Sequence, residues 1–345
     1  MPKIFFVVSG EHESLPFSEL EAILEAENVS YRVLEKHTQV LVLEAPKESV
    51  KIIADRSALT RICAVEIFRC GAEYSEIIEE AACSPIEDYI REGESFVVRV
   101  KRVAGSSPHL STIKLERKIG EIILSSVGKV KVNLFRPEKT FFGVITDDYF
   151  FFGLKLAEIL PKPFVERRPK KKPFFHPSAM PAKLSRCMVN LARAKAGDLL
   201  LDPFCGTGSI LIEAGFIGCK ILGCDAKRLM VEGSLRNLTY YGLKPNGLVV
   251  ADARKPPFTY ADCVATDPPY GRSATTMKST TKEIVYETLQ VLAQILPKGG
   301  HVCMASPKTI GLSEIGKELG YKHLESHFVY VHRSLTREIA VFKRE

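Results

Sequence analysis

Four short apolar runs in the second half of the chain each end at an aspartate. They are residues 199–201 before Asp202, 221–224 before Asp225, 248–251 before Asp252 and 263–266 before Asp267. Helical stretches separate these runs at intervals that suit a parallel sheet with crossover helices. Because the carboxyl ends of parallel strands meet at one edge, where ligands bind, we expect the four carboxylates to converge. One such aspartate is usually a helix cap, but four in series are hard to explain by capping alone.

The first of these aspartates begins a loop that contains two glycines, Asp-Pro-Phe-Cys-Gly-Thr-Gly-Ser, residues 202–209. Gly206 and Gly208 allow a tight turn and let a ligand approach bare backbone where the next helix begins. Leu211 stands where a dinucleotide-binding loop has its third glycine, and no Gly-Lys-Ser/Thr follows. Both observations argue against a nicotinamide cofactor and a P-loop nucleotide.

The second and third aspartates suit an adenosine-containing ligand. Asp225 lies 17 residues beyond Gly208, where a carboxylate can accept hydrogen bonds from both hydroxyls of a ribose. Asp252 could accept one from the exocyclic amine of adenine. A ligand with adenosine but no pyrophosphate fits this arrangement, and S-adenosylmethionine is the obvious candidate.

The fourth aspartate opens the most specific motif, Asp267-Pro268-Pro269-Tyr270, which Gly271 follows. At a proline usage of about 5%, this tetrad is rare by chance. Its two prolines make a stiff loop whose first carbonyls are not used by a helix. A planar amine could donate its hydrogens to the Asp267 carboxylate and the Pro268 carbonyl while Tyr270 stacks on the ring. The alternative is a rigid turn with a buried tyrosine, but the place after the fourth run favours function.

Charge is distributed unevenly along the chain. The net charge is +7, with −10 in residues 1–94, +10 in residues 95–175 and +7 in residues 176–345. Residues 161–173 contain four prolines and a net charge of +5, which predicts a solvated linker that is neither helix nor inner strand. Such a distribution suggests a polyanionic partner. The alternative is ordinary surface charge.

The first half is expected to contain small mixed units of strands and helices. Apolar spacing predicts strands at residues 4–8, 40–43 and 64–68 and helices at 17–27 and 48–59, a β-α-β-α-β order that resembles a ferredoxin-like unit. Further helices are expected at residues 77–90 and 112–125, and further strands at 95–103, 141–146 and 149–154.

Several classes of protein are disfavoured. The sequence contains no run of 18 or more apolar residues, so we expect no transmembrane helix. The apolar run at residues 4–8 is too short for a secretory signal. Nine scattered cysteines without a Cys-x-x-Cys pair disfavour a disulfide scaffold or zinc cluster and indicate a reducing cytosol. His323 and His327 have the spacing of helical metal ligands, but the segment alternates like a strand and lacks a suitably spaced acidic ligand. We therefore expect a cytoplasmic protein without a bound metal.

Together, these motifs resemble class I S-adenosylmethionine-dependent amino-methyltransferases, in which Asp-Pro-Pro-Tyr is the catalytic motif. The segment His176-Pro177-Ser178-Ala179-Met180 looks like an additional cofactor motif of that family. Residues 132–138, Val-Asn-Leu-Phe-Arg-Pro-Glu, are similar to the hallmark segment of THUMP domains, which bind RNA. The resemblance covers nearly the whole chain and is closest to the archaeal tRNA guanosine-10 N2-methyltransferases.

The resemblance implies an α/β protein with four parts. They are a ferredoxin-like domain at residues 1–70, a THUMP domain at 71–157, a basic linker at 158–175 and a Rossmann-like methyltransferase domain at 176–345, which has a mostly parallel seven-stranded sheet. The expected catalytic residues are Asp267, Pro268, Pro269 and Tyr270. The expected cofactor-binding residues are His176, Ser178, Met180, Asp202, Cys205, Gly206, Thr207, Gly208, Asp225, Ala226, Asp252, Ala253 and Asp267. The expected RNA-binding residues are Arg136, Arg167, Arg168, Lys170, Lys171 and Lys172.

The implied activity is methyl transfer from S-adenosylmethionine to the exocyclic N2 of a guanosine in tRNA, at position 10, adding one or two methyl groups. Three alternatives remain open: N2-methylation at another tRNA or rRNA site, N6-methylation of adenine in DNA, and RNA binding without catalysis. The expected partner is tRNA rather than a membrane. We expect a monomer, with a helper subunit left open.

Overall fold

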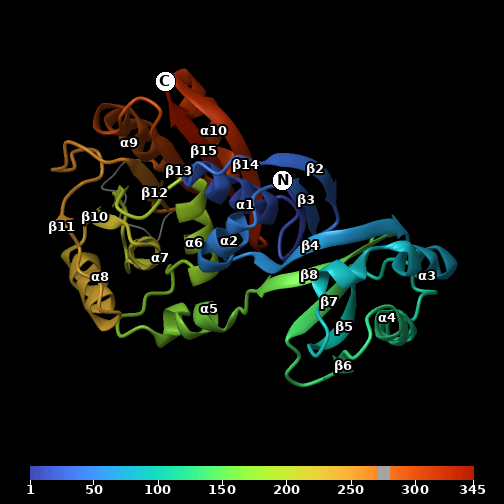
Figure 1. Ribbon diagram of the computed structural model, residues 1–345. Helices are drawn as coiled ribbons and strands as arrows, with labels where there is room; N and C mark the ends of the chain where they lie inside the picture. Colours follow the sequence, from blue (N-terminus) through green and yellow to red (C-terminus); the bar gives the residue numbers. More distant parts are fainter. Residues whose placement is uncertain (271–279) are drawn as a thin grey trace. The chain divides into compact units, whose positions relative to one another are not determined.

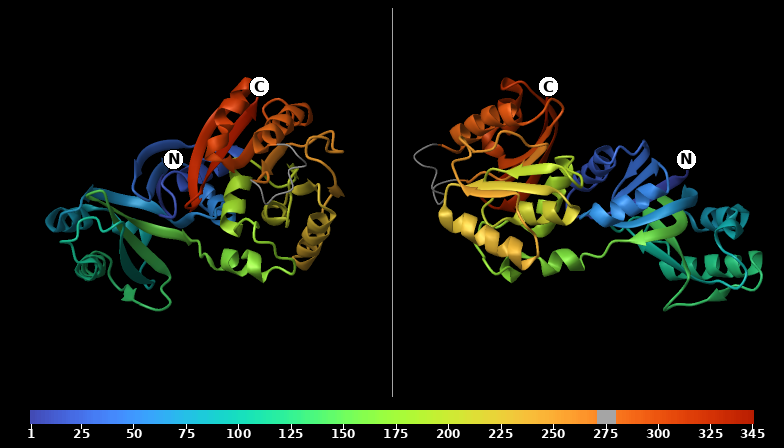
Figure 2. Two further views of the ribbon diagram at one scale, coloured as in Figure 1. Left: turned by 180° about the vertical axis from the view of Figure 1, so that it is seen from behind. Right: turned by 60° about the vertical axis from the view of Figure 1, so that its left-hand side comes forward.

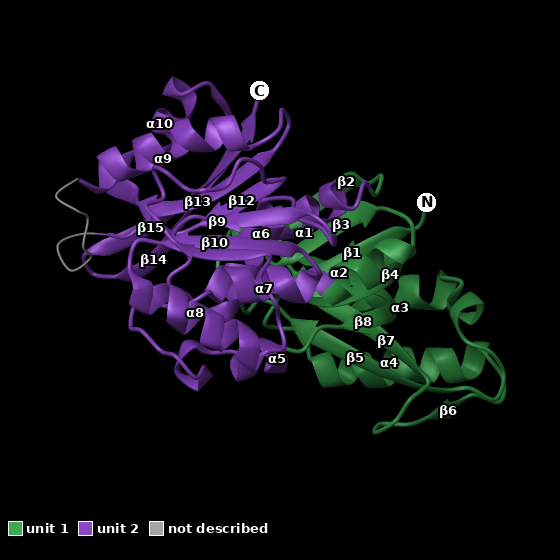
Figure 3. Cartoon of the chain, turned by 90° about the vertical axis from the view of Figure 1, so that its left-hand side faces the viewer, with its two compact units in different colours: residues 1–17, 29–55, 60–160 green, residues 18–28, 56–59, 161–345 purple. Residues whose placement is uncertain are grey.

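The computed structural model describes residues 1–270 and 280–345, so Gly271 of the expected motif lies outside the described residues. The chain divides into two compact units, which Figure 3 colours separately. The first unit comprises residues 1–17, 29–55 and 60–160, and the second comprises residues 18–28, 56–59 and 161–345. Each unit is organised around one β-sheet.

The first unit contains an eight-stranded sheet in the order β2-β3-β1-β4-β8-β7-β5-β6. Its strands are β1 (Lys3–Val8), β2 (Arg32–His37), β3 (Val40–Glu44), β4 (Thr60–Gly71), β5 (Ser95–Arg102), β6 (Lys131–Val132), β7 (Lys139–Thr146) and β8 (Tyr149–Glu158). Neighbouring strands are antiparallel, except that β5 runs parallel to β6 and β7. Because β4 pairs with β8, residues on both sides of position 70 share this sheet.

The helices of the first unit cover the sheet with apolar side chains. They are α2 (Glu48–Arg56), α3 (Tyr74–Cys83) and α4 (Thr112–Ser126), with a 3-10 turn at Ile86–Tyr89; α1 (Leu15–Ala26) begins in this unit and continues in the second. One core packs Ile77 of α3 and Ile119 of α4 against Phe96, Phe141 and Phe152 of the sheet. Burial of such large side chains stabilises the unit.

Two expectations about the first half were wrong. The strand β2 was missed because its side chains are mostly exposed or half-buried and form no apolar run. The helix expected at residues 77–90 ends at Cys83 and is followed by a separate 3-10 turn. Pro85 separates the two, because its ring and missing N–H do not allow the α-helix to continue.

The second unit contains a seven-stranded sheet in the order β11-β10-β9-β12-β13-β15-β14. Its strands belong to the part of the chain that Figure 1 colours from yellow to red. Its strands are β9 (Leu199–Asp202), β10 (Lys220–Asp225), β11 (Gly247–Val250), β12 (Cys263–Thr266), β13 (His301–Pro307), β14 (Tyr321–His332) and β15 (Leu335–Arg344). The first five strands in this order are parallel, whereas β15 pairs antiparallel with β13 and β14. Both views in Figure 2 show β14 and β15 as a red hairpin. The predicted mostly parallel seven-stranded sheet is confirmed.

The helices of this unit are α5 (Lys162–Glu166), α6 (Ala182–Leu191), α7 (Ser209–Ile217), α8 (Arg228–Tyr240), α9 (Thr281–Ile295) and α10 (Leu312–Glu318), with 3-10 turns at Pro169–Lys171 and Lys308–Ile310. Figure 3 shows α9 and α10 on one side of the sheet and α7 and α8 on the other. The core under α9 and α10 packs Leu289 and Ile315 against Leu201, Val264 and Phe342 of the strands. Within the described ranges, each helix is too short or too polar to cross a bilayer.

The segment at residues 161–173 differs from the expected structureless linker. Residues 162–166 form α5, and residues 169–171 form a 3-10 turn. Pro163 and Pro169 lie in the first turn of these helices. Backbone N–H groups there have no partner within the helix, so proline removes no helical hydrogen bond. The domain boundaries expected at residues 70, 157 and 175 remain predictions.

Candidate active site

The carboxyl ends of four parallel strands bring the four aspartates together. Asp202 and Asp225 are the last residues of β9 and β10, Asp267 directly follows β12, and Asp252 lies two residues beyond β11. All four line one cavity of about 820 Å³ in the second unit. The topology explains this convergence, because parallel strands end at the same edge of the sheet.

This cavity also contains nearly all other residues expected to bind a cofactor or act in catalysis. Those in its wall, besides the aspartates, are His176, Ser178, Met180, Cys205, Gly206, Thr207, Ala226, Ala253, Pro268, Pro269 and Tyr270. Gly208 is the exception and lies at the N-cap of α7. The predicted motifs, which span 95 residues from His176 to Tyr270, therefore form one site.

The glycine loop passes close to the carboxyl end of β10. The backbone N–H of Gly206 donates a 3.1 Å hydrogen bond to the Asp225 carboxylate. Gly208 has φ +76°, and a Cβ there would lie 2.4 Å from Oγ of Ser234. Glycine is therefore needed at this position for both conformation and space. Cys205 is buried in the loop and burial raises the pKa of its thiol, which does not suit a nucleophile.

Asp202 is the most deeply buried of the four aspartates. Its Oδ1 accepts hydrogen bonds from the Thr266 hydroxyl, at 2.7 Å, and from the backbone N–H of Phe204, at 3.1 Å. Burial raises the pKa of Asp202 to about 7, while these two donors act in the opposite direction. The carboxyl group therefore titrates close to neutral pH.

The surroundings of Asp225 and Asp252 differ. Asp225 accepts hydrogen bonds from the backbone N–H groups of Gly206 and Lys227, and burial raises its pKa. Asp252 accepts from the Arg254 side chain, with a shortest distance of 2.6 Å, and this hydrogen bonding lowers its pKa. Arg254 also contacts Glu287. The carboxylate expected to meet an adenine amine therefore already has a cationic neighbour, which the motif did not reveal.

The entrance segment is held by a local side-chain contact. His176 Nδ1 lies 2.7 Å from Ser178 Oγ, and the backbone N–H of Ser178 donates to the same ring nitrogen at 3.3 Å. Met180 is buried two residues before α6 begins. These three residues form one wall of the cavity.

The Asp-Pro-Pro-Tyr loop is hydrogen-bonded to β15, the last strand in the sequence. The Tyr270 hydroxyl donates to Oδ1 of Asp267, and it accepts a 3.0 Å hydrogen bond from Nε of Arg337 on β15. Nη2 of Arg337 lies 3.4 Å from Oδ2 of Asp267. Burial raises the pKa of Asp267 to about 6, and the Arg337 charge acts against that rise.

Sequence reasoning missed the part of the wall that belongs to β14 and β15. Val329, Tyr330, Val331, His332 and Arg337 line the cavity. None lies in a recognisable motif. The only sequence signal for Arg337 is the charged pair Arg337-Glu338 near the start of an otherwise apolar strand.

The residues expected to bind RNA fall into two groups. Arg136 in the first unit and Arg168, Lys170 and Lys171 in the second are exposed, as phosphate contacts require. The Asn133 side chain accepts from the backbone N–H groups of residues 135 and 136, which orders the hallmark loop. Exposure alone leaves RNA binding by these residues a prediction.

Arg167 and Lys172 correct the expectation of a uniformly solvated basic run. Arg167 pairs with buried Glu213 through two hydrogen bonds of 2.7 and 3.0 Å. The Lys172 ammonium is buried and donates to Ser209 at 2.8 Å, and burial lowers its pKa to about 8. Both charges are used inside the second unit, because a buried cation requires a local partner.

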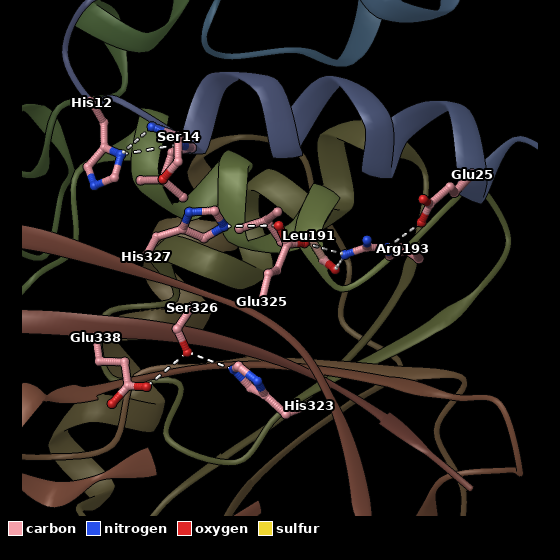
Figure 4. A network of polar contacts seen from close by, with 11 residues as sticks. His12, Ser14, Glu25, Leu191, Arg193, His323, Glu325, Ser326, His327 and Glu338 are labelled. Atoms are coloured by element: carbon pink, nitrogen blue, oxygen red, sulfur yellow. Dashed lines mark hydrogen bonds and ion pairs between the residues drawn. The ribbon is translucent and has the colours of Figure 1, made fainter. Parts of the chain in front are cut away.

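The two histidines considered as metal ligands have other contacts (Figure 4). His323 Nε2 lies 2.8 Å from Ser326 Oγ, and His327 is buried beside Glu325, at 3.2 Å. In the described part of the chain, no group of three or more histidine, cysteine, aspartate or glutamate side chains is arranged to hold a metal ion.

Known proteins resemble both halves of the chain. Residues 72–155 match the THUMP domain, and residues 169–338 match the family described as RMKL-like, methyltransferase domain. The tRNA (guanine(10)-N2)-dimethyltransferase of Methanothermobacter thermautotrophicus is 37% identical over 352 residues, covering 99% of each chain. The protein of the same name from Methanocaldococcus jannaschii is 34% identical over 365 residues, again covering 99% of each.

A solved structure resembles the whole fold. The crystal structure of TrmN from Thermus thermophilus superimposes with a TM-score of 0.54 and covers 99% of this chain and 100% of its own. Its sequence identity is 19%, so the likeness concerns the fold alone.

Proposed function

Because the chain belongs to the family of archaeal tRNA (guanine(10)-N2)-dimethyltransferases, we propose that it transfers methyl groups from S-adenosylmethionine to the N2 amine of guanosine 10 in tRNA. The observation that carries this proposal is the convergence of four strand-end aspartates and the Asp-Pro-Pro-Tyr loop on one cavity. A cavity lined by four carboxylates suits a cationic nucleoside cofactor and a planar amine.

The residues of the cavity fit S-adenosylmethionine. The glycine loop presents bare backbone at the start of α7, and Asp225 lies beside it as an acceptor for the ribose hydroxyls. Asp202 would hold the methionine part of the cofactor, and Asp252 with Ala253 would hold its adenine, since all three residues line the same cavity. The cofactor supplies a methyl group on a positively charged sulfur, which is activated toward nucleophiles.

The chain itself must make a poor nucleophile reactive, because the lone pair of an exocyclic amine is delocalised into the ring. The Asp267 carboxylate and the Pro268 carbonyl accept the two amine hydrogens, which turns the nitrogen lone pair toward the methyl group. Positioning of this kind supplies much of the acceleration. The Asp267 charge also stabilises the positive charge that develops on the nitrogen. The methylated amine then loses its proton to water.

The target guanine must leave its stack to reach this loop. Tyr270 lines the cavity beside Asp267, where its ring can stack on the flipped base. The THUMP domain and the exposed cations Arg136, Arg168, Lys170 and Lys171 provide phosphate contacts that do not read sequence. We place the protein in the cytoplasm as a monomer acting on tRNA.

Incubation with labelled S-adenosylmethionine and either tRNA, rRNA or double-stranded DNA tests the activity. Nucleoside analysis should find N2-methylguanosine and N2,N2-dimethylguanosine from tRNA only, and a transcript with adenosine at position 10 should accept no methyl group. The matched control is Asp267→Asn, which keeps the shape of the side chain but removes its negative charge. N6-methyl-2′-deoxyadenosine from DNA, or label in a tRNA lacking guanosine 10, would overturn the proposal.

A further inference from the structure

Arg337 connects β15, the last strand in the sequence, to both polar side chains of the Asp-Pro-Pro-Tyr loop. It lies near the start of β15, is 9% exposed and lines the cavity. Its Nε donates to the Tyr270 hydroxyl at 3.0 Å, and its Nη2 lies 3.4 Å from Oδ2 of Asp267. Because the Tyr270 hydroxyl in turn donates to Asp267, the three side chains form a closed ring of contacts.

We propose that Arg337 is a positioning residue for methyl transfer, which holds Asp267 as a charged acceptor and fixes the ring of Tyr270 beside the target base. This inference rests on the proposed function, since it concerns the same site. Arg337 does not touch the reacting atoms. It acts through the two residues that meet the amine and the base.

Arg337 lies close enough to Asp267 for its charge to act on that carboxyl group. Burial raises the pKa of Asp267 to about 6, even though the Arg337 charge acts against the rise. A protonated carboxyl group would lose much of its strength as an acceptor for the target amine. Arginine suits this task because its guanidinium keeps its charge in buried surroundings.

Other charged groups around the cavity do not replace Arg337. Asp202, at the end of neighbouring β9, is itself a carboxyl group whose pKa Asp267 raises. Asp252 and Arg254 pair with each other on the far side of the glycine loop. The remaining titratable or charged residues of the wall are His176, Cys205, Asp225, Lys227, Tyr330 and His332.

Arg337 also orients the ring of Tyr270. The Arg337 guanidinium carbon lies 5.3 Å from the centroid of the Tyr270 ring, so it covers one face of that ring. A base can then stack only on the opposite face. The hydrogen bond from Nε fixes the phenol oxygen at the same time. A planar guanidinium can both cover the ring and donate this hydrogen bond.

Two substitutions test the proposal by single-turnover methyl transfer to tRNA. Arg337→Gln should lower the rate at saturating tRNA roughly tenfold or more, with little change in S-adenosylmethionine affinity. In the plot of this rate against pH, the acid limb of the variant should move to higher pH by about half a unit or more. Arg337→Lys keeps the charge but lacks the planar guanidinium with its several N–H donors. It should therefore restore the wild-type position of the acid limb but only part of the rate. Lys322→Gln, which removes an exposed charge from β14, is the matched control and should change neither quantity.

A second measurement does not depend on the substrate. In protein with 13C-labelled tyrosine Cζ, the Tyr270 resonance, identified by its loss in Tyr270→Phe, should shift as Asp267 titrates. The midpoint should be higher in Arg337→Gln and restored in Arg337→Lys. If the wild-type protein methylates no tRNA, the proposed function fails, while this titration still tests Arg337. An unchanged midpoint, or a loss of rate without a shift of the acid limb, would show a merely structural role and overturn the inference.

Discussion

Thr266, the last residue of β12, donates a 2.7 Å hydrogen bond from its hydroxyl to Asp202, the last residue of β9. Both residues are at most 1% exposed. The contact joins the ends of two adjacent parallel strands. Burial raises the pKa of Asp202 to about 7, while the hydrogen bond from Thr266 acts against this rise. Because the pKa of Asp202 is raised on folding, the stability of the site depends on pH.

The first prediction concerns that dependence. Because the pKa of Asp202 rises from 3.8 in the unfolded chain to about 7 in the folded one, protonation favours the folded state. Its contribution is fully present below about pH 4 and is lost as the pH rises through 7, and it amounts to at most about 4 kcal/mol. Asp202→Asn, which cannot ionise, should therefore gain stability relative to the wild type at pH 8 but not at pH 5. Urea unfolding at the two pH values measures this difference.

Asp55→Asn, on the exposed face of α2, serves as the control for this experiment and should show no such contrast. Equal effects of Asp202→Asn at both pH values would contradict the prediction. Thr266→Val should raise the pKa of Asp202 further, because it removes a donor to the carboxylate.

The second prediction concerns cofactor binding by Asp225. Asp225→Ala should weaken S-adenosylmethionine binding by about tenfold or more, since a charge-assisted pair of hydrogen bonds contributes on the order of 1.5–3 kcal/mol. Calorimetric titration gives the affinity. Asp225→Asn can still accept one hydrogen bond, so its affinity should lie between those of the wild type and Asp225→Ala. Unchanged affinity in a folded Asp225→Ala variant would disprove the assignment to the ribose.

The third prediction separates chemistry from binding at the Asp-Pro-Pro-Tyr loop. Asp267→Ala should abolish methyl transfer while S-adenosylmethionine affinity stays largely intact, because the carboxylate is assigned to the target amine. Tyr270→Ala should also bind the base more weakly, since stacking contributes about 1–3 kcal/mol. Single-turnover kinetics at saturating tRNA distinguish the two effects. A near-normal transfer rate in Asp267→Ala would mean that the loop is structural.

The fourth prediction concerns the basic run at residues 161–173. The double variant Lys170→Ala/Lys171→Ala should bind tRNA more weakly and with a smaller salt dependence, because fewer counterions are released. Cofactor affinity should stay the same. The control is Lys51→Ala, at another exposed lysine, which lies in the acidic part of the chain. Identical affinity and salt dependence in the double variant would show that these lysines are merely solvated.

Lys172 behaves differently from its neighbours because its ammonium is buried against Ser209. Lys172→Ala removes an internal partner rather than a surface charge. It should lower the thermal midpoint of the protein without changing the salt dependence of tRNA binding. A flatter salt dependence in this variant would contradict its placement.

The local order of the catalytic half could be predicted from the sequence because each signal there is short-range. Apolar runs that end in Asp202, Asp225, Asp252 and Asp267 indicate strands that feed a common edge. The glycine loop and the Asp-Pro-Pro-Tyr tetrad are recognisable because their backbone demands restrict the residues that can occupy them. Strand β2 escaped prediction because most of its side chains are not fully buried and therefore leave no apolar pattern.

Only the tertiary structure decided which charges are available at the site. Arg337 and Tyr270 are 67 residues apart and meet because β15 lies antiparallel beside β13. Within one run of basic residues, Lys171 remains in solvent whereas Lys172 is buried. The physical reason is that local sequence determines the backbone conformation, whereas the burial and partners of an ionisable side chain depend on distant elements packed around it.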